Sequence, residues 1–223
     1  MPDEKREISE LHSQETRLAL FSFNSSTVWD LGSAIRALAL KEYPEQSAYI
    51  TITHANGTPL FVAHTTDSLS PGYVAEAEAI RNSVRRWEIS SWRRNRLLAL
   101  TEAPSEYDKA EAKSAEFSLK GGGWPIRVKG VVGVVAIVVV TGLFSPHNGK
   151  AQSFNPLKYD RPTDANHELV VKALDMVLDK QKNSPVPTSD RVFAPDSGRN
   201  WEAYEAAIGY RGDLRYKAEY EMQ

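Results

Sequence analysis

The valine-rich run from Val131 to Phe144 is the feature that most restricts the fold of this chain. It is apolar and dominated by β-branched side chains, but it is shorter than the roughly 20 residues that a membrane-spanning helix needs. Gly133 and Gly142 also interrupt it. Polar residues do not alternate with apolar ones between Val131 and Thr141, so we expect a strand there with both faces buried.

Two hairpins are expected to build the sheet that contains this strand. Asn56-Gly57 lies between the β-prone stretches Ser47–Thr53 and Pro59–His64, and Asn-Gly is the strongest short signal for a hairpin turn. A further strand is expected over Trp124–Val128, directly before the valine run. A sheet made from two hairpins must be largely antiparallel, and helices must cover it.

Helical periodicity fills the rest of the expected domain. Thr27 and Asp30 have the spacing of a capping box, and Pro44 is expected to end the helix that follows. A second helical pattern runs from Tyr73 to about Leu100, with a break expected at Ser90-Ser91. A third helix is expected after Asp164, which can cap it. The expected apolar face of the first helix is Val28, Leu31, Ile35 and Leu38, and that of the second is Val74, Ala77, Ile80, Val84 and Trp87. The face of the third is Leu169, Val170, Ala173, Leu174, Val177 and Leu178.

Composition places the chain among globular proteins. Of its 223 residues 41% are hydrophobic and 25% are charged, and the formal net charge is -2. There are no cysteines, which excludes disulfides and thiolate chemistry. The first ten residues lack an apolar signal segment, so we expect a cytoplasmic protein. Because the apolar run is too short to span a bilayer and the net charge is slightly negative, we expect neither insertion into membranes nor binding to nucleic acid.

These patterns predict one α/β domain of the α+β type with flanking segments. Residues 1–20 form a polar N-terminal extension and residues 21–182 form the domain. Residues 183–223 form a linker rich in Pro, Ser and Asp, followed by an aromatic C-terminal tail.

Three separated blocks of this sequence resemble the haem-degrading domain family, also called the GlcG/HbpS-like family, in its branch of small bacterial and fungal proteins. The blocks are Gly121–Arg127 with the valine strand up to Leu143, then His167–Leu174, and, more weakly, Val84 with Arg86-Trp87 and Ser90-Ser91. The resemblance covers roughly residues 21–178. It implies a profilin-like three-layer α/β/α fold and symmetric homo-oligomers.

The chain departs from the family pattern at two places. The branch usually carries an Arg-Lys pair before the Ser-Ser block, and that pair falls here on Ala79 and Ile80. The family tends to have Asp directly before its final histidine, where this chain has Asn166, with Asp164 two residues further back. A family activity that depended on those charged groups is therefore not expected here.

His167 is the best candidate ligand for a cofactor. It lies near the start of the last helix, where the helix dipole disfavours the imidazolium, so a neutral ring could bind haem iron, or could simply bond locally. In the haem hypothesis, Arg81 and Arg85 pair with the propionates. His54 and His64 border the first hairpin without facing each other, so no metal pair is expected there.

A dense basic stretch on the second helix suggests a phosphate or carboxylate site, or alternatively a solvated face or an oligomer interface. Its members are Arg81, Arg85, Arg86, Arg93, Arg94 and Arg96. The glycines Gly121, Gly122 and Gly123, with Trp124, predict a close backbone approach at a subunit contact. In the tail, Trp201, Tyr204 and Ile208 recur at helical spacing and are expected to dock on the protein's own oligomer or on a protein partner.

Three functional hypotheses follow. The leading one is a non-catalytic, homo-oligomeric binding or scaffold protein, because no recognised catalytic motif occurs in the sequence and the charged pair of the family is missing. The second is a haem-binding or haem-degrading protein that uses His167. The third is a cytosolic adaptor in a protein-targeting or chaperone pathway.

Overall fold

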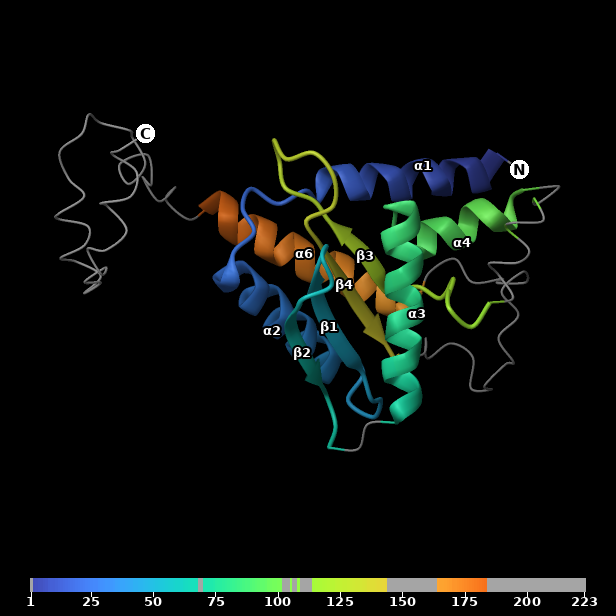
Figure 1. Cartoon of the computed structure of the whole chain (residues 1–223). Helices are drawn as coiled ribbons and strands as arrows, with labels where there is room; N and C mark the ends of the chain where they lie inside the picture. The colour runs from blue at the N-terminus through green and yellow to red at the C-terminus, as the bar shows by residue number, and fades with distance from the viewer. Residues whose placement is uncertain are drawn as a thin grey trace, which may run out of the picture. The chain divides into compact units, whose positions relative to one another are not determined.

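Figure 1 shows the computed structural model of the chain, which describes residues 2–67, 70–101, 105, 108, 114–143 and 164–183. The helices of this part are α1 (Pro2–Arg17), α2 (Ser25–Glu42), α3 (Pro71–Trp87), α4 (Ser91–Ala99) and α6 (Ala165–Asn183), and its strands are β1 (Tyr49–His54), β2 (Pro59–His64), β3 (Gly123–Ile126) and β4 (Ala136–Thr141). The chain divides into two units, Met1–Ser184 and Pro185–Gln223, and the second lies outside the described residues.

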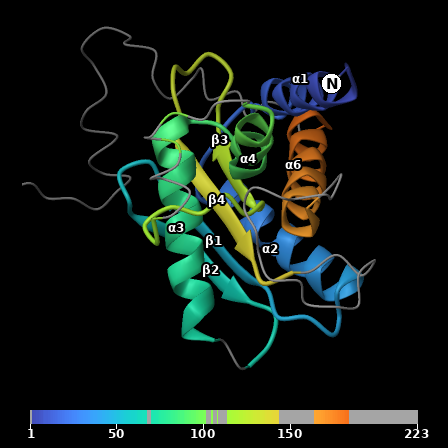
Figure 2. The same cartoon turned by 90° about the vertical axis from the view of Figure 1, so that its right-hand side faces the viewer.

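The four strands form one antiparallel sheet in the order β2-β1-β4-β3. The two expected hairpins, β1–β2 and β3–β4, are joined through the pairing of β1 with β4, in which Ile50 lies opposite Val140. Figure 2 shows α3 on one side of this sheet and α2 and α6 on the other. The expected profilin-like, three-layer α/β/α arrangement is confirmed.

Alternate residues of the central strands supply the two halves of the core. Ile50, Ile52, Val138 and Val140 pack with α2 and α6, whereas their neighbours Tyr49, Ile137 and Val139 pack with α3. Every residue of β4 is buried, as expected for a strand without alternation.

The first part of the valine run was predicted wrongly. The strand expected from Val131 begins only at Ala136, and Val131 and Val132 are 51% and 101% exposed. Gly130 and Gly133 have φ values of +80° and +92°, which turn the chain before the strand can form. Val131–Val135 is therefore part of the loop that leads from β3 into β4.

The Asn56-Gly57 turn is confirmed, with one adjustment. Only Gly57 has a positive φ, +96°, and its N–H donates to the His54 carbonyl at 2.8 Å. The strand register also shifts between Ile52, which pairs with Phe61, and Thr53, which pairs with Pro59, so β2 accommodates one extra residue, Leu60, beyond the turn. His64 lies opposite Tyr49, so it does not face His54, as expected.

The helix starts were predicted with mixed success. Asn24 caps α2 by accepting from the Thr27 N–H at 2.9 Å. The helix therefore begins about one turn earlier than predicted, and the predicted Thr27–Asp30 capping box is wrong. The break between α3 and α4 is confirmed. Glu88 ends α3 in the left-handed region, and the Ser90 hydroxyl caps α4 by accepting from the Arg93 N–H. Val74 of the predicted α3 stripe is 44% exposed.

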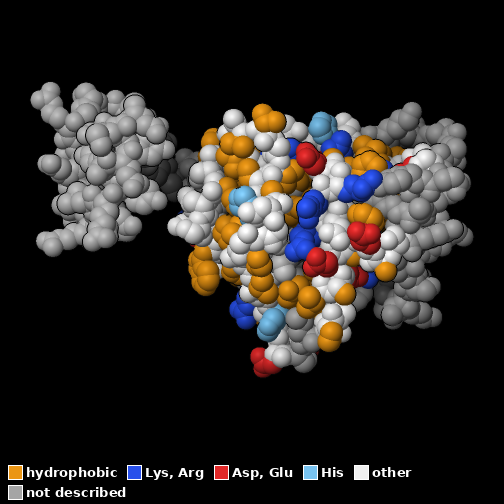
Figure 3. Space-filling view, in the orientation of Figure 1, with side chains coloured by type: hydrophobic (Ala, Val, Ile, Leu, Met, Phe, Trp, Pro, Cys, Tyr) orange, Lys and Arg blue, Asp and Glu red, His pale blue; other side chains and the backbone are white. Residues whose placement is uncertain are grey.

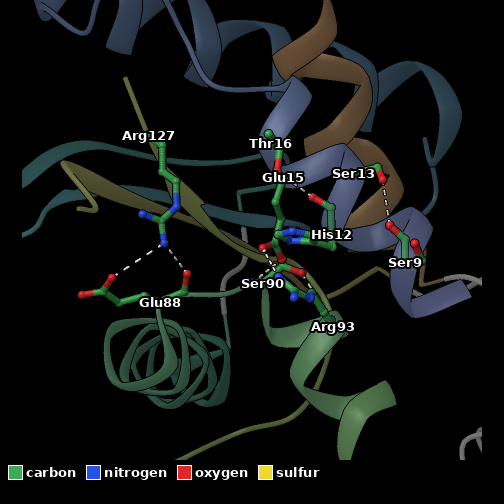
Figure 4. A network of polar contacts seen from close by, with 9 residues as sticks. All are labelled: Ser9, His12, Ser13, Glu15, Thr16, Glu88, Ser90, Arg93 and Arg127. Carbon is green, nitrogen blue, oxygen red and sulfur yellow. Dashed lines mark hydrogen bonds and ion pairs between the residues drawn. The ribbon is translucent and has the colours of Figure 1, made fainter. Parts of the chain in front are cut away.

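Residues 1–20 were expected only to be a polar extension, but the structure has α1 there. Leu11 and Leu18 are buried, and two ion pairs join α1 to α4. In one pair, the Glu15 carboxylate accepts from Arg93 and also from the backbone N–H of Ser90, both at 2.8 Å (Figure 4). In the other, Glu7 accepts from Arg96 at 2.8 Å. None of the described helices has the combined length and hydropathy of a membrane span.

Candidate functional site

His167 lies in the first turn of α6 and packs on β3. Its ring centroid is 5.4 Å from that of Trp124, and the ring planes are inclined by 48°. Both side chains are almost fully buried, at 5% and 2% exposed. The sequence gives no direct signal for this contact, because the two residues belong to different blocks of the chain.

The start of α6 is held by Asp164, as predicted. Its Oδ1 accepts from the backbone N–H groups of Asn166 at 2.9 Å and His167 at 3.2 Å. The Asn166 amide in turn exchanges two hydrogen bonds of 3.1 Å with the backbone of Leu143. These bonds fix the position of the His167 backbone relative to the end of β4.

The glycines before β3 allow this packing, and the close approach that they permit lies within one chain. A Cβ on Gly121 would be 2.3 Å from Asp164 Cγ, and one on Gly122 would be 2.0 Å from the Val140 carbonyl oxygen. Gly123 N–H donates to the Ser91 hydroxyl at 3.0 Å. The subunit contact expected for Gly121, Gly122, Gly123 and Trp124 stays a prediction, and all four are buried in the single chain.

Burial governs the electrostatics of this site. It lowers the pKa of His167 to about 4, so the imidazole is neutral near pH 7. Burial also raises the pKa of the Asp164 carboxyl, although the hydrogen bonds from His167 and Asn166 oppose that shift. Neither ring nitrogen of His167 has a hydrogen-bond partner in the part of the chain that the structure describes.

A neutral imidazole with unpartnered nitrogens is the chemistry that a haem iron or metal ion needs. The surrounding space fits a large ligand poorly, because the ring is 5% exposed and Asp164, Asn166 and the β4 backbone fill the volume beside the glycines. Over the described residues, no group of three or more His, Asp or Glu side chains could hold a metal ion.

The predicted basic stretch is divided between two helices with different roles. On α4, all three arginines make intramolecular ion pairs: Arg93 with Glu15, Arg94 with Asp108 and Arg96 with Glu7. The prediction of one basic helix is therefore wrong, and the α4 arginines hold the fold together.

The α3 arginines lie away from His167. Arg81 pairs with Glu78 on its own helix, and Arg85 is exposed. Because α3 and α6 cover opposite faces of the sheet, the structure does not bring Arg81 and Arg85 together with His167 around one cofactor. Trp201, Tyr204 and Ile208 of the tail lie outside the described residues.

Two surface features were not predicted. Trp29 of α2 is 67% exposed and lies edge-on to Phe61 of β2, with ring centroids 6.0 Å apart. A groove beside α3 is lined by Arg85, Arg86 and aromatic side chains. The exposed pair of Trp29 and Phe61 could have been found from the sequence, because Trp29 lies off the apolar stripe of its helix and β2 contains no Lys, Arg, Asp or Glu.

Comparison with known proteins agrees with this fold. The sequence profile described as "Haem degrading protein HbpS-like" matches residues 23–151. A UPF0303 protein of Acidobacterium capsulatum is 32% identical over 166 residues, covering 72% of this chain and 83% of that protein. A UPF0303 protein of Azotobacter vinelandii is 28% identical over 177 residues, covering 79% and 92%.

A solved structure, that of the Ybr137w protein, superposes with a TM-score of 0.63 at 20% identity and covers 80% of this chain and 90% of the other. This similarity supports the fold alone. The profile match spans more than half of the chain, and it includes the sheet, α2, α3 and α4. The chain belongs to the HbpS-like family, among the relatives of the UPF0303 proteins.

Proposed function

We propose that this protein is a homo-oligomeric, non-catalytic binding or scaffold protein whose copies associate through β2. The observation that carries the proposal is the difference between the two edges of the sheet. One edge is covered by the chain itself, whereas the other presents an uncharged apolar strand.

At the β3 edge, the segment before α2 pairs with the residues that directly follow the strand. Leu20 forms a parallel bridge with Val128, donating to the Arg127 carbonyl at 2.9 Å and accepting from the Lys129 N–H at 2.8 Å. Leu20 is fully buried, and every residue of β3 is buried. This edge is not available for pairing with another chain.

At the β2 edge, no described strand pairs with the outer side of Pro59–His64. Val62 is 56% exposed and Leu60 39% exposed, and β2 carries no Lys, Arg, Asp or Glu. Val62 pairs with Thr51 on the α3 side, and Phe61 pairs with Ile52 on the α2 side, so apolar groups lie on both faces of the edge. Charges normally protect such an edge from association; here Arg36 of α2 donates to the His64 carbonyl at the end of the strand at 3.1 Å, but β2 itself carries no such charged side chain.

A second copy of the chain fits this edge best. Two β2 strands related by a two-fold axis would pair antiparallel, continue the sheet and bring the same apolar side chains together. Trp29, which is 67% exposed, flanks Phe61 and extends the apolar surface onto α2. Figure 3 shows apolar side chains, in orange, gathered on this flank of the molecule.

The mass of the full chain in solution, measured by light scattering after gel filtration, tests the proposal. We expect a multiple of the chain mass for the natural sequence and a shift towards monomer for Val62→Lys. Val132→Lys is the matched control, because Val132 is fully exposed in the β3–β4 loop and should leave the mass unchanged. A monomeric natural chain, or an unchanged mass for Val62→Lys, would contradict the proposal. Truncation after Pro195 tests separately the assembly role predicted for the tail.

Haem binding by His167 is the second candidate function, and the unpartnered, buried ring nitrogens favour it. It requires the side chains around the ring to move, because the ring is almost fully covered. A haem titration followed at the Soret band should then saturate at a fixed stoichiometry, and His167→Ala should abolish the shift. His54→Ala, at an exposed turn, is the control. A weak shift that is equal in all three proteins would rule this function out.

A further inference from the structure

We infer that a groove beside the C-terminal half of α3 binds a small organic anion with a flat aromatic ring. This site is distinct from His167 and from the β2 edge, and it does not depend on either proposed function. The groove is shallow and open to solvent, and its volume of about 520 Å³ is large enough for a small molecule. Its described lining residues are Asn82, Arg85, Arg86, Trp87, Glu116 and Phe117.

Two aromatic rings from different parts of the chain form its apolar walls. Trp87 ends α3 and Phe117 precedes β3, and both are half-buried. The Arg86 guanidinium carbon lies 5.8 Å from each ring centroid, so this cation bridges the two rings. A flat ligand ring would find aromatic and guanidinium planes there, and both stack well on π-systems.

The walls are held in place by contacts within the chain. The Arg94 guanidinium lies 3.7 Å from the Trp87 ring centroid, and its position is fixed by Asp108 at 2.6 Å. The segment carrying Phe117 is tied to α3, because Asn82 donates to the Glu116 carbonyl at 3.1 Å. The next residues continue this connection, with Ser118 N–H donating to the Ala79 carbonyl at 3.1 Å. A preformed site loses less entropy when a ligand binds.

The charge of the groove selects an anion. Arg85 is exposed and makes no hydrogen bond or ion pair with any described residue. Arg86 adds a second guanidinium, whereas Glu116 is the single carboxylate of the lining, so the described lining has a net positive charge. Figure 3 shows basic, acidic and apolar side chains interspersed on the side of the molecule that carries α3. A guanidinium binds a carboxylate or a phosphate through paired hydrogen bonds, so either group on a flat ring fits.

Isothermal titration of the full chain with 2-naphthoate and with 2-naphthyl phosphate tests this inference and shows which anionic group the site prefers. We expect saturable binding of at least one of them. The Arg85→Gln change should weaken that binding about tenfold, because it removes a charge-assisted contact. Arg81→Gln is the matched control, since Arg81 lies one turn away on the same helix, pairs with Glu78 and does not line the groove.

Two further ligands test the chemistry of the site. Cyclohexanecarboxylate keeps the charge without the aromatic ring, and 2-naphthylmethylammonium keeps the ring with the opposite charge. Both should bind much more weakly than the naphthyl anions. The inference is overturned if neither naphthyl anion saturates, if either of the two further ligands binds equally well, or if Arg81→Gln weakens binding as much as Arg85→Gln does.

Discussion

Glu15 and Arg93 are 78 positions apart in the sequence, and their side chains meet at 2.8 Å where α1 crosses the start of α4. The same carboxylate accepts from the backbone N–H of Ser90, the residue that caps α4. Both charged side chains are largely withdrawn from water, at 6% and 17% exposed. One acidic group thus fixes a helix packing and a helix start together (Figure 4).

We predict that Glu15→Gln lowers the free energy of unfolding by about 2–4 kcal/mol, because it leaves the Arg93 charge buried without its counter-charge. Urea denaturation measures this change. Glu10→Gln is the control, since Glu10 also lies on α1 but forms an exposed pair with Arg6, and its loss should cost less than about 0.5 kcal/mol. Equal effects of the two changes would show that the buried pair does not stabilise the α1–α4 packing.

Gly122 supports a second prediction. It has a φ of +103°, and a Cβ there would lie 2.0 Å from the Val140 carbonyl oxygen. This oxygen belongs to the backbone of β4, so the strand would have to move to make room for the added atom. We expect Gly122→Ala to cost about 4 kcal/mol or more, or to prevent folding. Two causes contribute to this cost, the steric overlap with Val140 and the strain of a positive φ in a residue with a side chain. Gly130→Ala separates them, because Gly130 has a φ of +80° but nothing within 4 Å of the added atom.

Gly130→Ala should therefore cost only the conformational strain, about 1–2 kcal/mol. Thermal denaturation of both variants measures the difference. If Gly130→Ala proved as costly as Gly122→Ala, the close approach between β4 and the segment before β3 would not be the cause.

Features encoded by neighbouring residues could be predicted from the sequence. The Asn56-Gly57 turn, the break at Ser90 and the Asp164 cap each depend on side chains within four residues of the backbone that they control. The β propensity of Val131 and Val132 favours a strand, but the positive φ values of Gly130 and Gly133 turn the chain there and leave both valines exposed.

Contacts between distant segments could not be predicted in the same way. The residues 1–20 look like a solvated extension because the partners of Glu7 and Glu15 lie on α4, far along the chain. For the candidate site, a neutral His167 was expected from the helix dipole, but the cause is burial. Its contact with Trp124 depends on how α6 packs on β3, which no local pattern specifies.

The Asp164 cap leads to a third prediction. Besides the N–H groups of Asn166 and His167, the carboxylate accepts a backbone hydrogen bond from Gly121, so its loss leaves buried donors without an acceptor. We expect Asp164→Ala to lower the free energy of unfolding by about 2–3 kcal/mol. Asp164→Asn keeps a side-chain oxygen at the same place and should cost about 1 kcal/mol or less in urea denaturation near neutral pH. Equal losses in both variants would show that the cap oxygen is not what matters.

His167 gives a prediction about pH. Its pKa is about 4 in the folded protein, against an ordinary value of 6.5 for an imidazole in water, so the unfolded chain takes up the proton first as the pH falls. Stability is therefore complete above about pH 6.5 and decreases as the pH falls towards about 4. Each pH unit in this window corresponds to about 1.4 kcal/mol, so the whole contribution is on the order of 3 kcal/mol.

The His167→Leu variant should lose this pH dependence, and it should be at least as stable as the natural chain near neutral pH, because two unpartnered buried nitrogens are removed. Asp164 contributes with the opposite sign, since its raised pKa makes the folded state bind a proton more readily, but it is present in both proteins. The difference between their urea-denaturation curves, taken at several pH values between about 4.5 and 7.5, therefore isolates His167. His54→Leu, at an exposed turn, should show the natural pH dependence. A His167→Leu protein with that same dependence would mean that the imidazole is not held buried and neutral beside Trp124.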